Sequence, residues 1–460
     1  GRKKLHVAVD TMAILGRGSV KDTYNLLSDG IAQLVRALAS ASNRDAASWA
    51  SEQGLERHLT GNVKGSASGE VDWDAAASKQ RFLAGIVFDA KRLLELAGRA
   101  CTRHGKGSEA AKAIEAAATL LTKLLCQDIE YKGDEPCIKE GVAKDRIPSV
   151  HDPELRHGRK SSTGRFDGHK GAVAADTESQ LITAADMLPG NAHDSEKALT
   201  LTEQSEANTG MDVADTAGDC AYGTGETRRE FAEAGRKLTA PVPRPPRNGK
   251  LPKTAFKISR KQDRVTCPGG CTTKTFNWVK TQPNAKGRRY RVKRFQFPAQ
   301  RCAGCPLREK CVGGTGTKGR TVTLHPQEAM LQQARRRQHT KEFRDAKRRR
   351  QTVEHRIARL RQLGVRQARY VGRAKTLFQL LMAATVANLT LIAGWAASAG
   401  DVWVYFVRRL IAWAVSGGRS AARTLGIRIG APRRTFEARA VIAATVCRLS
   451  LKMPASRPGF

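Results

Sequence analysis

The chain has 460 residues, 40% of them hydrophobic, and carries a formal net charge of +37. This length and composition exclude a disordered chain and allow two or more domains, each with a buried core. A charge of this size marks a polyanion partner, because lysines and arginines that neutralise phosphates release condensed counterions. A membrane surface is the competing partner, but the sequence has no lipidation motif and its basic residues run through long segments rather than one helix.

The first predicted element is a strand over residues 5–10, which ends on Asp10. An Asp at the end of a strand often faces a ligand crevice in α/β folds, although it is as often a cap or turn residue. Residues 22–126 then follow a helical pattern, interrupted by a polar stretch at 41–72 that is predicted to be a loop. This segment shows no catalytic constellation, and we interpret it as a helical insertion.

Strands and helices alternate after a polar, irregular segment at residues 127–168. The predicted order is strand, strand, helix, strand, helix, strand, and the first two strands are expected to form an antiparallel hairpin. The corresponding ranges are 169–176, 181–188, 196–208, 211–217, 226–234 and 237–242. The third of these strands leads into Gly218 and Asp219, so Asp219, like Asp10, is predicted at a strand end.

Five of the ten cysteines fall within 45 residues, which is typical of a metal site rather than a secreted disulfide framework. They are Cys267, Cys271, Cys302, Cys305 and Cys311. Tight cysteine pairs joined by a spacer can present thiolates to one tetrahedral Zn²⁺ ion, so a structural zinc knuckle with one spare thiol is predicted. Reduced, metal-free cysteines in a compact loop are the alternative.

The run at residues 286–295 interleaves basic and aromatic side chains. Such a mixture suits a nucleic-acid strand, because aromatic rings stack with bases while cations follow the backbone. The alternation of Tyr290, Val292 and Phe295 also fits one buried strand face, so both interpretations stay open.

The most basic part of the chain is residues 318–375, where eighteen Lys and Arg face only four Asp and Glu. Within it, residues 347–360 are predicted to form one amphipathic helix. Its buried stripe consists of Val353, Ile357 and Leu360. Residues 376–400, the longest uncharged run, could span a membrane by length, but their polar and small residues favour a buried helix of a soluble domain.

Glu354 lies beside that stripe, and Lys347, Arg350 and Arg361 are spaced so as to share its helix face. Taken alone, this pattern is that of a solvated basic helix with an incidental Glu. In an RNase H-like sheet, however, the strands of Asp10 and Asp219 would lie side by side, with the Glu354 helix packed across them. Three such carboxylates can hold two divalent cations, Mg²⁺ or Mn²⁺, for in-line phosphoryl transfer.

Several segments, in order along the chain, resemble bacterial insertion-sequence transposases of the DDE class. They are residues 9–11, 21–27, 152–154, 157–161, 218–223, 305–311 and 350–354. An ordered set is far more specific than any one motif. The resemblance implies an α/β fold: an RNase H-like mixed sheet flanked by helices, with a helical insertion after the first strand and a Cys-rich insertion before the catalytic Glu helix.

The resemblance also implies that Asp10, Asp219 and Glu354 are the catalytic metal ligands of an enzyme that cuts and joins DNA at element ends. Asp152 and Asp176 are rivals for the first acid. The residues expected to contact nucleic acid are Lys347, Arg348, Arg349, Arg350, Arg361, Lys160 and Arg159. Lys347 stands where relatives commonly carry Tyr, and Arg361 where they carry Lys, so the positive charge is kept.

Six units are expected. They are a first core strand at 1–20, a helical insertion at 21–145, the RNase H-like core at 146–252, a Cys-rich insertion at 253–318, the Glu helix and last core helix at 319–396, and a basic tail at 397–460. Relatives carry a helical domain ahead of the first acid, whereas only nine residues precede Asp10 here, so a truncated or decayed copy is expected.

The expected partners are the terminal inverted repeats of the element and its target DNA, bound by a homodimer in the bacterial cytoplasm near the nucleoid, with no membrane involved. Two other functions remain open. One is a non-catalytic, zinc-stabilised nucleic-acid-binding protein. The other is an RNase H-like nuclease that hydrolyses nucleic acid without joining ends.

Overall fold

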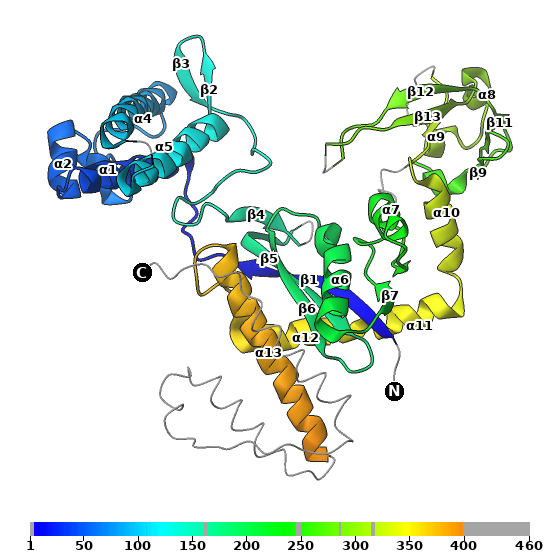
Figure 1. The fold of residues 1–460 in the computed structure, drawn as a ribbon. Helices are drawn as coiled ribbons and strands as arrows, with labels where there is room; N and C mark the ends of the chain where they lie inside the picture. Colours follow the sequence, from blue (N-terminus) through cyan, green and yellow to red (C-terminus); the bar gives the residue numbers. More distant parts are fainter. Residues whose placement is uncertain are drawn as a thin grey trace.

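The computed structural model describes residues 4–105, 107–160, 163–244, 250–284, 287–313 and 318–398. A mixed six-stranded sheet lies at its centre (Figure 1). Its strands are β1 (Leu5–Leu15), β4 (Arg156–Arg159), β5 (Arg165–Asp176), β6 (Ile182–Pro189), β7 (Val213–Ala217) and β8 (Leu238–Thr239). The predicted α/β class is therefore confirmed, while the predicted basic tail beyond Ser398 lies outside the described residues.

Strand β1 occupies the middle of the sheet, between β5 and β7. It pairs antiparallel with β5 and parallel with β7, and β7 pairs parallel with β8. The other edge of β5 pairs antiparallel with β4 and, further along, with β6. The β5–β6 pairing confirms the predicted hairpin, and the β1–β7 pairing confirms that the strands associated with Asp10 and Asp219 are neighbours.

Strand β1 continues past the end predicted for it. The prediction ended the strand on Asp10, but the strand runs to Leu15, with Asp10 opposite Val173 and Leu15 opposite Gly168 of β5. The extra residues stay in the sheet because Met12 and Ile14 are fully buried beneath the covering helices. Asp10 is therefore an interior strand residue, and its placement at a strand end was wrong.

Helices cover both faces of this sheet. They are α6 (Ala198–Thr209), preceded by η2 (Asp194–Lys197), on one face, and α12 (Gln351–Leu360) and α13 (Arg373–Ser398) on the other. In β1, Val7 and Val9 belong to the apolar cluster under α6, whereas Ala8 and Met12 belong to the cluster under α12 and α13. Since side chains alternate along a strand, Asp10 lies on the face that α12 covers.

Helix α13 contains the long uncharged run. By length and composition it is long and apolar enough to cross a membrane. In the structure it packs against β6, where Leu380 and Ala384 are buried. The Asn388 side chain also donates to the Ile182 carbonyl (2.8 Å) and accepts from the Ile182 N–H (2.9 Å). The sheet therefore accounts for one apolar side of the helix.

A helical module follows β1 and has its own apolar core. It comprises α1 (Thr23–Ala41), α2 (Ala46–Gln53), η1 (Glu56–Thr60), α3 (Val63–Ser66), α4 (Ala76–His104), α5 (Glu109–Asp128), and the hairpin β2 (Ile129–Lys132) and β3 (Glu135–Ile138). The loop predicted at 41–72 is wrong, because Trp49, Leu55 and Val63 bury α2, η1 and α3 in this core. The segment at 127–168, predicted as irregular, contains β2, β3 and β4 and the start of β5.

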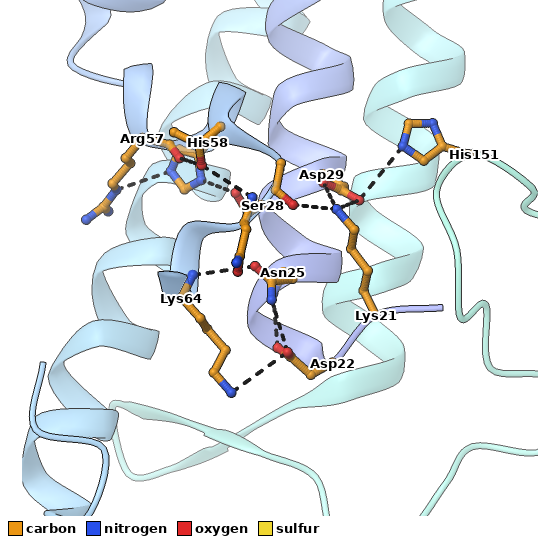
Figure 2. Close-up of polar contacts among 12 residues, drawn as sticks. Lys21, Asp22, Asn25, Ser28, Asp29, Arg57, His58, Lys64 and His151 are labelled. Atoms are coloured by element: carbon orange, nitrogen blue, oxygen red, sulfur yellow. Dashed lines mark hydrogen bonds and ion pairs between the residues drawn. The ribbon is translucent and has the colours of Figure 1, made fainter. Parts of the chain in front are cut away.

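Buried polar side chains join the helices of this module (Figure 2). The Ser28 hydroxyl lies 2.9 Å from His58 Nδ1, and His58 Nε2 lies 3.0 Å from Asp89 Oδ2, which also accepts from Arg57 (2.5 Å). Ser28 is 2% exposed and His58 is fully buried, so no substrate reaches this Ser–His–Asp row. It is a structural link between α1, η1 and α4.

A Cys-rich module and a series of helices complete the described chain (Figure 1). Their elements are α7 (Gly225–Glu233), η3 (Lys253–Ala255), β9 (Lys257–Ser259), β10 (Arg264–Thr266), β11 (Thr272–Thr273), β12 (Phe276–Lys280), β13 (Arg291–Gln296), α8 (Ala299–Ala303), α9 (Arg308–Cys311), β14 (Thr321–Thr323), α10 (Glu328–Arg337), α11 (Lys341–Arg349) and η4 (Arg361–Val365). The single helix predicted at 347–360 is two helices, α11 and α12, which meet at Arg350. The predicted stripe of Val353, Ile357 and Leu360 is buried.

Candidate active site

Asp10, Asp219 and Glu354 come from three elements that pack together. Asp10 lies within β1, Asp219 follows β7, and Glu354 lies in the first turn of α12. Ala8 of β1 pairs with Ala217 of β7 in parallel register, so Asp10 and Asp219 each stand two residues beyond the same pair. Helix α12 packs on β1 and β5. Glu354 is therefore carried by the helix that covers the Asp10 face of the sheet.

Arg350 joins the acid on the sheet to the acid on the helix. Its Nη1 lies 3.6 Å from Asp10 Oδ2, and its Nη2 donates to Glu354 Oε1. The Arg350 side chain is 16% exposed, whereas that of Glu354 is 48% exposed. The junction between α11 and α12 thus places one largely buried guanidinium between two of the three predicted ligands.

The Asp10 carboxyl is largely buried among charges of both signs. Burial raises its pKa and the nearby Asp219 acts in the same direction, whereas the Thr11 N–H, Lys160 and Arg350 lower it; the net shift is upward. The Thr11 N–H donates to Asp10 Oδ1 (2.7 Å), and Lys160 Nζ donates to the Thr11 carbonyl (2.6 Å). The charged form of Asp10 therefore depends on the cations around it.

Two groups beside the acids escaped the sequence analysis. Tyr222 is fully buried, and its hydroxyl has no hydrogen-bond partner in the described part of the chain. Burial raises the pKa of Tyr222 well above its ordinary value, and Asp10, Asp194 and Asp219 add to the effect. Asp194 forms an ion pair with Lys170 (2.8 Å). The one sequence signal for Tyr222 is its position within residues 218–223, and Asp194 carries none.

The rival acids have structural partners elsewhere. Asp176 is 1% exposed and accepts hydrogen bonds from the Ser179 N–H (2.8 Å) and hydroxyl (2.7 Å), which closes the turn between β5 and β6. Asp152 is fully buried, with Oδ2 3.4 Å from His169 Nε2. Asp176 thus closes a turn and Asp152 pairs with His169, whereas Asp10 lies beside Arg350 and under the influence of Asp219.

The predicted nucleic-acid-binding residues fall into two groups. Lys160 and Arg350 lie at the acids. The exposed group consists of Lys347, Arg348, Arg349, Arg361 and Arg159. Lys347, Arg348 and Arg349 lie on α11, Arg361 directly follows α12, and Arg159 ends β4. Four of the five therefore stand just before or just after α12, the helix that covers the Asp10 face of the sheet.

Arg349 also lines a cavity of about 730 Å³ between β8, α7, α10 and α11. Arg228 and Arg337 line the same cavity. Burial lowers the pKa of Arg228 to about 10, and the charges of Arg337 and Arg335 act in the same direction. The Arg228 guanidinium donates to backbone carbonyls, including that of Gly223 (3.2 Å). A phosphate in this cavity would relieve the repulsion among these cations.

The five cysteines predicted to bind zinc line a second cavity, of about 600 Å³. All five are free of disulfide bonds. The Cys267 N–H donates to the Cys271 carbonyl (2.8 Å), which closes a tight turn, and the Arg320 N–H donates to Cys302 Sγ (3.5 Å). Burial raises the pKa of the Cys311 thiol.

Neither predicted metal site is assembled in the described part of the chain, where no three His, Cys, Asp or Glu side chains form a group that could hold an ion. At the acids, Arg350 lies between Asp10 and Glu354. The donor chemistry nevertheless fits each predicted ion, because carboxylate oxygens suit Mg²⁺ or Mn²⁺ and thiolates suit Zn²⁺.

Comparison with protein families gives a match over residues 266–393, to the family model described as a transposase DDE domain. The matched segment contains the five clustered cysteines, Arg350 and Glu354, but neither Asp10 nor Asp219. Searches of curated proteins and of solved structures found no match.

Proposed function

We propose that this chain cleaves DNA at the ends of an insertion element and transfers the strands to a target. Its match over residues 266–393 supports a transposase of the DDE class. The observation that carries the proposal is the contact of Arg350 with both Asp10 and Glu354. It joins the matched segment to a strand that lies more than two hundred and fifty residues before it. The proposed site therefore draws its acids from inside and outside the matched segment.

The strand order supports an RNase H-like core. Strands β6, β5 and β1 form an antiparallel series, and β7 and β8 then follow parallel to β1. The helical module lies between β1 and β4, and the Cys-rich module lies between β8 and α12. These are the positions that the resemblance to DDE transposases implies for two insertions in such a core.

In the proposed mechanism, Asp10, Asp219 and Glu354 would hold divalent cations, Mg²⁺ or Mn²⁺. Bound there, such ions activate water or a 3′-hydroxyl and stabilise the departing oxygen in phosphoryl transfer. The chain contributes the placement of the three carboxylates. Because burial disfavours the charge on Asp10, this carboxylate gains most from nearby positive charge.

Arg350 is proposed to position the scissile phosphate, since its guanidinium is the cation nearest to two of the acids. The exposed Lys347 and Arg361 would hold the DNA backbone on either side. The cavity lined by Arg228, Arg337 and Arg349 offers a further phosphate contact next to α11. A homodimer assembled on DNA, with one chain for each element end, is part of the proposal.

The experiment uses a labelled duplex that carries the ends of the element encoding the chain, with Mg²⁺ and unlabelled target DNA. We expect cleaved and joined products, and their loss in Asp219→Asn and Glu354→Gln. Arg99→Gln, on the exposed surface of α4, is the matched control and should keep activity. Cleavage that persists in both acid variants would overturn the mechanism.

The same assay separates the other two functions. Cleaved but never joined products would indicate an RNase H-like nuclease. Salt-sensitive DNA binding without any metal-dependent cleavage would indicate a non-catalytic, zinc-stabilised binding protein. The Asp10 contact with Arg350 favours catalysis over the latter, since a purely binding surface has no need of a largely buried acid.

A further inference from the structure

We propose that one face of the β12–β13 hairpin binds unpaired nucleotides by stacking bases on Trp278. This stacking face consists of Phe276, Trp278, Lys280, Arg291, Lys293 and Phe295. The proposal goes beyond cleavage and strand transfer, because the face contains none of the three acids and would bind a strand in a catalytically silent chain as well.

The strand register places these side chains together. Phe276 pairs with Phe295, Trp278 with Lys293, and Lys280 with Arg291, in antiparallel strands without a register shift. Because directly opposite residues in a sheet point to the same side and alternate residues share a face, all six project from one surface. Three residues of the run, Arg291, Lys293 and Phe295, thereby share a face with Trp278, whereas Val292 and Arg294 project from the opposite side.

The aromatic rings form a row that runs from the core into solvent. Phe295 is 1% exposed and anchors the row, and Phe276 contacts it with ring centroids 5.3 Å apart. Trp278 contacts Phe276 at 5.9 Å with perpendicular rings, and is itself 48% exposed. An indole held by a buried neighbour, with half of its surface open to water, is a rigid surface on which a base can stack.

Cations surround the exposed ring. The Arg291 guanidinium lies 5.0 Å from the Trp278 ring centroid, and Lys293 Nζ lies 4.4 Å from the Phe276 centroid. Lys293 also pairs with Asp263 (2.7 Å), which fixes its position. Residues 276–296 contain seven Lys and Arg and no Asp or Glu. The charge of the face therefore complements a phosphate backbone, while its rings complement bases.

The hairpin is attached to helix α7. The Tyr290 hydroxyl donates to Glu226 Oε2 (3.1 Å), and Arg288 lies 3.9 Å from Glu226 Oε1. Glu226 belongs to α7, which begins six residues after Asp219. These contacts connect the segment just before β13 to the helix that follows the Asp219 loop.

The observations favour unpaired over paired DNA. In a duplex the base faces are covered by their neighbours, so an exposed indole finds no partner there and only the cations contribute. In a single strand every base offers a free face, and stacking on an aromatic side chain strengthens binding with little sequence preference.

The test measures binding of the full-length chain to an oligodeoxythymidylate and to a duplex of equal length, without divalent metal, by fluorescence anisotropy. Trp278→Ala should weaken binding to the single strand about tenfold while leaving duplex binding nearly unchanged. Trp278→Phe should keep most of the affinity, because it keeps a ring. Phe88→Ala removes another exposed aromatic, on α4, and should have no effect.

A second readout is tryptophan fluorescence. Saturating oligodeoxythymidylate should quench the wild-type chain more than Trp278→Phe, because a stacked base quenches the indole that it covers.

Equal affinity of Trp278→Ala and wild type for the single strand would overturn the proposal. So would an equal loss on both DNAs, or equal quenching in wild type and Trp278→Phe. If Trp278→Ala misfolds, the quenching comparison still tests the proposal, because Trp278→Phe keeps an aromatic ring at this position. Its outcome is separate from that of the cleavage assay, which depends on the three acids.

Discussion

The Arg350 guanidinium lies 3.6 Å from the Asp10 carboxylate, although 340 positions of the chain separate the two residues. The same guanidinium donates to Glu354, one helical turn further along. In the structure Arg350 thus supplies, together with Lys160, positive charge beside a buried Asp10. A divalent cation that binds the same oxygens would compete with Arg350, and the proposed function gives this guanidinium a second task, contact with a substrate phosphate.

Arg350→Gln should slow DNA cleavage by roughly 10²-fold, the usual cost of removing one group that stabilises transition-state charge. Because Arg350 lowers the pKa of Asp10, its loss should also move the acid limb of the pH–rate profile to higher pH. Single-turnover cleavage measured across pH tests both effects. Arg350→Lys should recover part of the rate, and Arg359→Gln, on the same helix, should behave as wild type. An unchanged rate in Arg350→Gln would remove Arg350 from the site.

Asp10→Asn should stabilise the fold at neutral pH while it abolishes cleavage. Burial raises the pKa of Asp10, so the folded state binds more protons than the unfolded state above the ordinary value of 3.8. Stability therefore falls as pH rises through this window, and an uncharged side chain removes that loss. Thermal unfolding at pH 7 should show Asp10→Asn above wild type, with the difference vanishing below about pH 4.

Exposed Asp134→Asn, in the turn between β2 and β3, is the control and should leave the unfolding temperature unchanged. A lower unfolding temperature for Asp10→Asn at pH 7 would mean that the charge of Asp10 stabilises the fold, as in an ordinary ion pair. That result would contradict a carboxylate kept for a bound cation.

Local periodicity predicted most of the core elements. The β5–β6 hairpin, α6, β7, α7 and the buried stripe of α12 each have an apolar pattern that one element shows by itself. The second half of β1 was missed because the polar Asp10 and Thr11 interrupt that pattern, and the burial of Met12 and Ile14 depends on α12 and α13, far along the chain. Short helices α2 and α3 were missed because each buries only one or two side chains.

The site was harder to predict than the fold. Asp10, Asp219 and Glu354 could be proposed because each stands next to an apolar element, but their proximity depends on the parallel pairing of β1 with β7. Nothing local indicates that Asp194 and Tyr222 lie near them, since those contacts arise only once η2 and the β7–α7 loop pack around β1. Long-range contacts between single polar residues leave no periodic signal.

The helical module should lose stability as the pH falls below about 6.5. Burial lowers the pKa of His58 below its ordinary value of 6.5, against the opposing effect of Asp89. The unfolded chain therefore binds a proton in a pH range where the folded chain does not, and protonation favours unfolding. Hydrogen exchange of the α1 and α4 amides between pH 7.5 and about 5 measures the effect.

His58→Gln should remove this pH dependence, whereas His355→Gln, at an exposed position of α12, should keep it. Protection factors that are equal at both pH values in the wild-type chain would show that His58 binds its proton as readily in the folded as in the unfolded chain, in which case its link to Ser28 and Asp89 carries a charge at pH 5.

The purified chain should hold about one Zn²⁺, bound by four of the five thiols in the cavity. The Sγ atoms of Cys305 and Cys267 lie 3.3 and 3.8 Å from the place of a Cβ at Gly269, so these two thiols are expected among the four ligands. Elemental analysis should find zinc in wild type and a loss of it in Cys267→Ser and Cys305→Ser. Because a structural zinc site contributes directly to folding, the same two variants and a chelator should lower the temperature at which the Cys-rich module unfolds.

Cys126→Ser, on α5, is the control outside the cavity. Zinc-free wild-type chain that unfolds at the same temperature as Cys305→Ser would show that the cysteines are plain reduced thiols.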